Sequence, residues 1–187
     1  MLNILRKHLE SEIGPTGVFD IVLYGSSVKG KLSPGDIDVL VIFLEGSLRE
    51  RLDKAQNIKI GLKKILHQNL DVKQILLKEL FSPGFFARTG LFLEGISVLS
   101  GKHFCENLGF KSYTLFSWSL NGLTHSEKIR FNYILAGRGS NGVLKEIGGE
   151  RISSGAAKIP IQNSLSFEEI LKANKVAFHK KNILEEM

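Results

Sequence analysis

The stretch Ile21–Phe43, IVLYGSSVKGKLSPGDIDVLVIF, decides how the rest of the chain is interpreted. Its first apolar run ends at Gly25, and a second apolar run opens with Asp36 and Asp38 after a polar turn. Both runs are short, β-branched and bounded by Gly, Ser and Pro, which predicts two buried strands. Because side chains alternate along a strand, Asp36 and Asp38 are expected on one face. Two adjacent carboxylates at the start of an apolar strand repel each other, which favours a divalent cation between them.

The composition is that of an ordinary globular protein, with 187 residues, 43% hydrophobic and 24% charged. A net charge of +6 permits a polyanionic ligand such as a nucleotide or RNA without requiring one. The single Cys105 excludes an internal disulfide and a cysteine zinc cluster, and we expect it to be a small buried side chain. The sequence shows neither an apolar run long enough to cross a membrane nor a signal-peptide pattern, so we expect a cytoplasmic location.

Residues 1–105 are predicted to form one domain of alternating helices and strands. Apolar residues at helical spacing predict a helix over 48–65 with basic residues elsewhere on its surface; these are Arg49, Arg51, Lys54, Lys59, Lys63 and Lys64. This basic face could approach a phosphate backbone, but we expect it to be solvated. Asp71 stands at the start of a third predicted strand, 70–77. The remaining predicted elements are a helix over 3–12, an aromatic-rich helix from Ser82 to Leu93, and a short strand over 96–99.

Residues 109–187 are predicted to form a second, small α+β domain. Thr124 and Glu127 show the capping-box pattern at the start of a helix that ends near residue 136. Pro160 would push the strand 156–161 to a sheet edge, because proline cannot donate to a ladder. The other predicted elements are strands over 112–120 and 176–184, a helix over 167–173, and loops around 137–142 and 148–149.

Two phosphate-binding patterns in the chain fail on their context. Residues 25–31, GSSVKGK, nearly match a P-loop, but Leu32 stands where Ser or Thr must ligate magnesium. Residues 137–142, GRGSNG, match a dinucleotide fingerprint, yet they follow a predicted helix instead of a strand. A surface loop is the better interpretation of this second pattern, although Arg138 could meet a phosphate there.

A third pattern is more specific. Gly25-Ser26, nine intervening residues, then Asp36-Ile37-Asp38, with Asp71 on a later strand, resembles the nucleotidyltransferase superfamily of DNA polymerase β. GSSVKG followed by GDIDV is similar above all to the minimal nucleotidyltransferases, with Lys29 where that family often has Arg. The resemblance covers roughly residues 1–100. It implies an α/β (α+β) fold, with a mixed sheet flanked by helices.

The resemblance also implies the site. Asp36, Asp38 and Asp71 would be the catalytic metal ligands for two Mg²⁺ ions, which stabilise both ends of an in-line displacement. The nucleotide would be bound by a set of small and basic residues, namely Gly25, Ser26, Ser27 and Lys29. Structural roles compete with this interpretation, since Asp36 could cap a turn and Asp71 could be a turn residue. Asp38 has no such role, because it interrupts an apolar strand.

The predicted function is transfer of an NMP from an NTP, which we expect to be ATP, to a hydroxyl of a protein or RNA acceptor. The second domain would then recognise that acceptor or a partner. One alternative is an antitoxin-like interaction protein with a toxin-like partner, as the resemblance implies. The other is an RNA-binding module whose nucleotidyltransferase fold has lost activity, against which the intact carboxylate trio argues.

Overall fold

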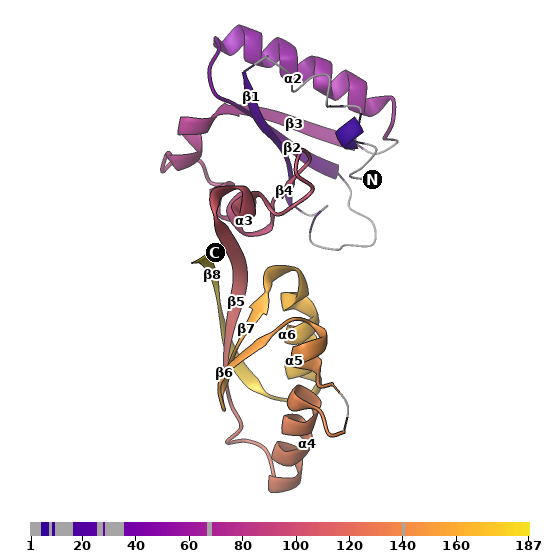
Figure 1. Ribbon diagram of the computed structural model, residues 1–187, viewed down its shortest axis with the longest axis vertical. Coiled ribbons are helices and arrows are strands. Elements are labelled where there is room, and N and C mark those ends of the chain that lie inside the picture. Colours follow the sequence, from indigo (N-terminus) through magenta and orange to yellow (C-terminus); the bar gives the residue numbers. More distant parts are fainter. Residues whose placement is uncertain are drawn as a thin grey trace. The chain divides into compact units, whose positions relative to one another are not determined.

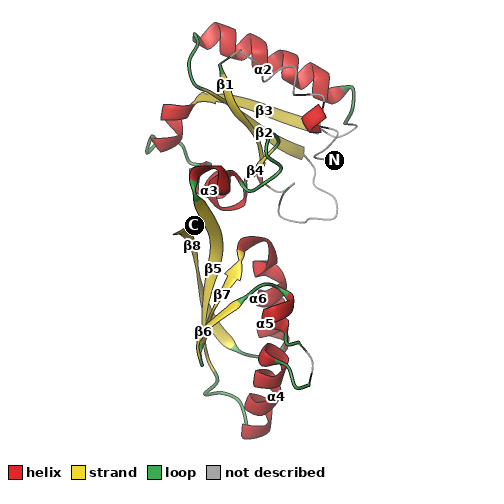
Figure 2. Cartoon of the chain, in the orientation of Figure 1, coloured by secondary structure: helices red, strands yellow, loops and turns green. Residues whose placement is uncertain are grey.

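The computed structural model describes residues 5–7, 9, 17–25, 28, 36–66, 69–139 and 141–187. The chain divides into two compact units, Met1–Phe110 and Lys111–Met187, each with its own four-stranded sheet (Figure 1). Leu5–Lys7 and Leu9 are helical, within the helix predicted over 3–12. Both units combine helices and strands, which confirms the predicted α+β class (Figure 2).

The sheet of the first unit has the order β3-β2-β1-β4. The hairpin of β1 (Val18–Tyr24) and β2 (Asp36–Phe43) is antiparallel, whereas β3 (Asn69–Leu76) runs parallel to β2. The short β4 (Ile96–Ser97) pairs antiparallel with β1. The sheet is therefore mixed, as predicted, and β3 forms one of its edges.

Both faces of the two central strands are buried, which explains why β1 and β2 appear as almost continuous apolar runs. One face packs against Ile58 and Leu62 of α2 (Leu48–Lys63). The opposite face packs against Leu91 of α3 (Arg88–Glu94) and Phe104. A capping box between Ser47 and Glu50 fixes the start of α2, since Glu50 N–H donates to Ser47 Oγ and Ser47 N–H donates back to the Glu50 carboxylate.

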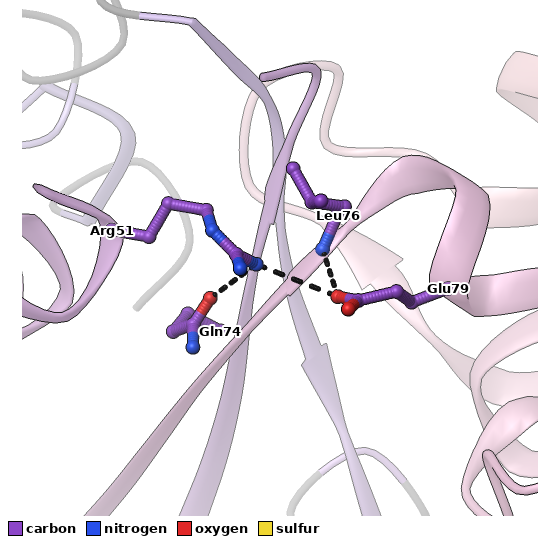
Figure 3. A network of polar contacts seen from close by, with 4 residues as sticks. All are labelled: Arg51, Gln74, Leu76 and Glu79. Carbon is purple, nitrogen blue, oxygen red and sulfur yellow. Dashed lines mark hydrogen bonds and ion pairs between the residues drawn. The ribbon is translucent and has the colours of Figure 1, made fainter. Parts of the chain in front are cut away.

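Arg51 is not on the solvated face of α2 where the sequence placed it. Its side chain is 7% exposed, and Nη1 donates to Gln74 Oε1 at 2.8 Å and to Glu79 Oε2 at 3.4 Å (Figure 3). The same Glu79 oxygen accepts the backbone N–H of Leu76. A buried arginine needs such partners, so Arg51 connects α2 to the end of β3.

The aromatic-rich helix predicted from Ser82 begins later than expected. A 3₁₀-helix spans Leu77–Phe81, turns follow Ser82, and α3 starts only at Arg88. Pro83 ends one element without starting the next, because the residue before a proline is kept out of the helical region. Cys105 is buried in the 3₁₀-helix Phe104–Leu108, as predicted.

The second unit has a sheet of order β6-β7-β5-β8 and three helices. Its core contains Phe116 and Trp118 of β5 (Phe110–Ser119), Phe131 of α4 (His125–Ala136) and Phe167 of α6 (Ser164–Ala173). The predicted capping box before α4 is present, with Thr124 Oγ1 accepting from Glu127 N–H. The other elements are α5 (Val143–Glu146), β6 (Glu150–Ser153), β7 (Ala156–Pro160) and β8 (Ala177–Glu186).

The placement of Pro160 at a sheet edge was wrong, because β7 lies between β5 and β6. Pro160 pairs with Tyr113 of β5, while β6 reaches only as far as Lys158 along β7. Pro160 thus lies beyond the end of β6, where its missing N–H removes no bond to that strand.

Candidate active site

Three side chains form a row across the first sheet. Tyr24, the last residue of β1, pairs in register with Asp38, and Asp38 pairs in register with Asp71 of β3. In-register neighbours project to the same face of a sheet. The row therefore brings together two of the three predicted carboxylates from strands far apart in the chain.

Asp36 precedes Asp38 by two residues and so projects to the same face. It is exposed, and it pairs in register with Asn69. The three carboxylates thus share one face at the start of β2 and β3. Next along that face comes Leu40, which belongs to the apolar cluster with Val22 and Leu91.

The electrostatics of Asp38 reflect its crowded position. Burial is the largest cause that raises the pKa of the Asp38 carboxyl above its ordinary value. The negative charge of Asp71, and more weakly that of Asp36, also raises this pKa, whereas the Lys73 ammonium lowers it. Ionised Asp38 is therefore short of positive charge, which a bound cation would supply.

Lys73 lies beside this group, and sequence reasoning did not find it. Its Nζ is 3.0 Å from Asp71 Oδ2, and the hydrogen bond to Asp71 is the main cause that raises the pKa of Lys73. Lys73 also hydrogen-bonds Tyr24, whose pKa is raised chiefly by burial. Lys73 follows Asp71 by two residues on a predicted strand, so their shared face was readable from the sequence.

Gly25 follows directly on β1 and has a positive φ of 75°. A Cβ placed there would lie 2.2 Å from Asp38 Oδ2, which is far inside van der Waals contact. The sequence favoured glycine here because its backbone can approach phosphates. The structure shows a second reason, since only glycine leaves room for the Asp38 carboxylate beside this turn.

The other predicted nucleotide-binding residues, Ser26, Ser27 and Lys29, lie outside the described residues. Val28 is described and packs against the cluster on the α2 side of the sheet. Within the described part of the chain, no group of three or more His, Cys, Asp or Glu is already gathered closely enough to hold a metal ion. In this structure Asp71 is bound by Lys73 instead.

The glycine-rich loop after α4 contains an interaction that differs from the phosphate contact suggested for Arg138. The Arg138 guanidinium lies over the ring of Tyr133, 4.9 Å from its centroid. This cation–π contact accounts for the arginine within the second unit itself.

None of the described helices is long and apolar enough to cross a membrane.

Comparison with known proteins identifies the first unit. Residues 2–89 match the family model of the nucleotidyltransferase domain. A search of curated proteins finds no match. Among solved structures, a mutant of the toxin–antitoxin MntA–HpeT is 20% identical, with a TM-score of 0.40 over 58% of this chain and 79% of that one.

A second solved structure, a toxin–antitoxin with AMP-PNP, is 22% identical, with a TM-score of 0.39 over 57% of this chain and 78% of that one. The family match covers Gly25 and the strands that contribute Asp36, Asp38 and Asp71. Residues 2–89 are therefore a nucleotidyltransferase domain, which confirms the predicted family and the predicted class of enzyme for this part of the chain.

Proposed function

We propose that this protein transfers an NMP from an NTP to a hydroxyl group of a protein or RNA acceptor, with two magnesium ions. The observation that supports this most strongly is the row in which Asp38 of β2 lies opposite Asp71 of β3, with Asp36 on the same face. Carboxylate oxygens are the ligands that Mg²⁺ prefers, and burial, followed by the negative charge of Asp71, raises the pKa of Asp38. The donor set therefore fits a divalent cation.

In this proposal Asp36 and Asp38 would hold the cation that accompanies the nucleotide, and both would help Asp71 to hold the second. Bound Mg²⁺ would supply charge neutralisation at the attacking and leaving oxygens. A second cation at Asp71 would compete with the Lys73 ammonium, whose Nζ is 3.0 Å from Asp71 Oδ2. Lys73 is then free to contact the triphosphate.

The nucleotide would lie against the turn after β1. Gly25 lets the backbone come close to phosphate oxygens, and we propose Ser26, Ser27 and Lys29 as hydroxyl and ammonium donors to them. In the transfer, the acceptor oxygen bonds to the α-phosphorus as the bond to the bridging oxygen breaks. Pyrophosphate leaves with that electron pair, and the hydroxyl proton passes to solvent.

We propose ATP as the nucleotide and the second unit, residues 111–187, as the part that recognises the acceptor or a toxin-like partner protein. A cytoplasmic location agrees with this substrate.

The test is a thermal-shift and transfer panel of ATP, CTP, GTP and UTP, each with and without Mg²⁺. It compares wild type, Asp38→Asn and Asp53→Asn, where Asp53 is an exposed aspartate of α2 outside the row. We expect one NTP with Mg²⁺ to raise the Tm of wild type and Asp53→Asn but not of Asp38→Asn. Transfer to the labelled acceptor should fall about 10²-fold in Asp38→Asn. Equal nucleotide binding and transfer by all three proteins would refute the proposal.

A further inference from the structure

The outer edge of β3 has backbone groups that find no partner among the described residues. The Leu76 N–H donates to Glu79 Oε2 at 2.6 Å and so points away from β2. Backbone groups of successive strand residues point alternately to the two sides, so Val72 and Gln74 also direct their N–H and C=O outward. Within the part of the chain that the structure describes, these outward groups have no backbone partner and β3 has no neighbour on this side.

A cavity of about 400 Å³ follows this edge. Its lining includes Val72, Lys73, Gln74 and Ile75, which are consecutive residues of β3 and so project alternately to both faces of the sheet. A cavity that touches both faces of an edge strand must wrap around its open side. The cavity and the unpaired backbone groups of β3 therefore form a single feature, which we call the β3-edge groove.

The walls of the β3-edge groove are mainly apolar and carry positive charge. On one side α2 contributes Leu52, Ala55, Gln56 and Lys59, and on the other lies Phe85. Leu52 is 50% exposed and so presents an apolar surface to the groove. The charged residues in the lining, Lys59 and Lys73, are both cationic.

The groove is continuous with the candidate active site. Lys73 lines the groove, two residues along β3 from Asp71, and its Nζ is 3.0 Å from Asp71 Oδ2, so one end of the groove reaches the row of Tyr24, Asp38 and Asp71. A molecule lying along β3 would pass directly beside Asp71. We place the acceptor hydroxyl there, because Asp71 would hold the second cation, and one of the two cations stabilises the attacking oxygen.

We propose that the acceptor is an extended polypeptide segment, which adds to the free edge of β3 as a strand and brings a hydroxyl side chain to Asp71. A peptide backbone supplies alternating N–H and C=O groups that complement those of Val72 and Gln74. The ribose-phosphate backbone of RNA has no such series of donors. Lys59 and Lys73 favour acidic residues next to the hydroxyl. The role given to Asp71 in this inference rests on the proposed function. The binding of a peptide in the β3-edge groove does not depend on that function.

The experiment measures binding alone, without nucleotide or Mg²⁺. The probes are fluorescein-labelled nine-residue peptides in which valine alternates with polar residues, with a central tyrosine, serine or threonine and aspartates beside it. Each peptide is also made with N-methyl groups on every second amide, in both registers, and a labelled nine-nucleotide RNA is the third probe. Fluorescence polarisation with the full chain gives the affinity.

We expect at least one peptide to bind, and N-methylation in one register to weaken it about tenfold or more, as loss of several net hydrogen bonds predicts. Lys59→Glu should weaken the acidic peptide about tenfold. Lys63→Glu, the same charge change on an exposed lysine of α2 outside the groove, should leave the affinity within about twofold. Lys59 lies outside the catalytic row, so its variant should keep nucleotide binding.

Three results would overturn the inference: no saturable peptide binding up to about 1 mM, equal binding of the N-methylated peptides, or equal effects of the two lysine variants. Binding of the RNA alone would also overturn it in favour of a nucleic-acid acceptor. If no peptide binds but a nucleotide still binds in a way that requires Asp38, the assignment of the groove is wrong and the proposed function stands. If peptides bind and no NTP does, the proposed function fails instead.

Discussion

Asp20 is a buried carboxyl group whose ionisation should lower the stability of the first unit. The residue lies on β1 and is only 3% exposed. Its Oδ1 accepts from Ser97 Oγ at 2.9 Å and from Ile21 N–H at 2.7 Å, and its Oδ2 accepts from Asn107 Nδ2 at 3.3 Å. Burial outweighs these bonds and raises the pKa of Asp20 from 3.8 to about 6.

The sign of the pH effect follows from the two pKa values. Below pH 3.8 Asp20 is protonated in both states, so it contributes no pH dependence. Between pH 3.8 and about 6 the unfolded chain loses this proton while the folded chain keeps it, and the free energy of unfolding falls as the pH rises. Above about pH 6 the decrease in the free energy of unfolding is complete and amounts to about 3 kcal/mol.

Asp20→Asn removes the charge and keeps the shape, so it isolates this effect. We would measure the free energy of unfolding with urea from pH 4.5 to 8. The value for the variant should rise relative to that of wild type as the pH rises, and should exceed it by about 1–3 kcal/mol at pH 8. Asp53→Asn, at an exposed site, controls for the general loss of a negative charge. A wild-type to variant difference that is flat across this range would refute the assignment of a raised pKa to Asp20.

Three further predictions concern the first unit. Gly25→Ala should weaken Mg²⁺-dependent nucleotide binding by calorimetry about tenfold or more, because its Cβ would displace the Asp38 carboxylate; unchanged binding would show that this carboxylate can move without consequence. Arg51→Ala should cost about 1–2 kcal/mol in urea unfolding, because it removes the hydrogen bonds from α2 to the partly exposed Gln74 and Glu79. Lys73→Ala should tighten Mn²⁺ binding to nucleotide-free protein, measured by electron paramagnetic resonance, because it frees Asp71; weaker binding would show instead that Lys73 helps to hold the site.

The strands that carry the site were predictable from sequence because their physical signal is local. Apolar runs bounded by Gly and Pro located β1 and β2, and alternation put Asp36 and Asp38 on one face. The pairing of Asp38 with Asp71 was not predictable in this way, because parallel register depends on how α2 packs across the sheet. The assignment of Asp71 to the site came from the family resemblance.

The features that were not predicted from the sequence, such as β6 and the burial of Arg51, lack an apolar pattern that would indicate them. All four residues of β6, Glu150–Ser153, are exposed, so no alternation distinguishes this strand from a loop. Arg51 was assigned to solvent because charged residues rarely lie inside a protein, and its partners come from β3 and the 3₁₀-helix after it. Such partners are visible only once distant segments are brought together.

The strand directions in the first sheet have a consequence for the order in which the protein folds. β1 and β2 form an antiparallel hairpin of nearby residues, whereas β3 joins β2 only after the chain has crossed over through α2. Contacts between distant residues form late, because the entropy of closing the loop must be overcome first. We therefore expect Gly25, Asp36 and Asp38 to come together early and Asp71 to arrive last. A chain still emerging from the ribosome would have the first half of the site without the second, so the capacity for transfer would appear only when the unit is complete.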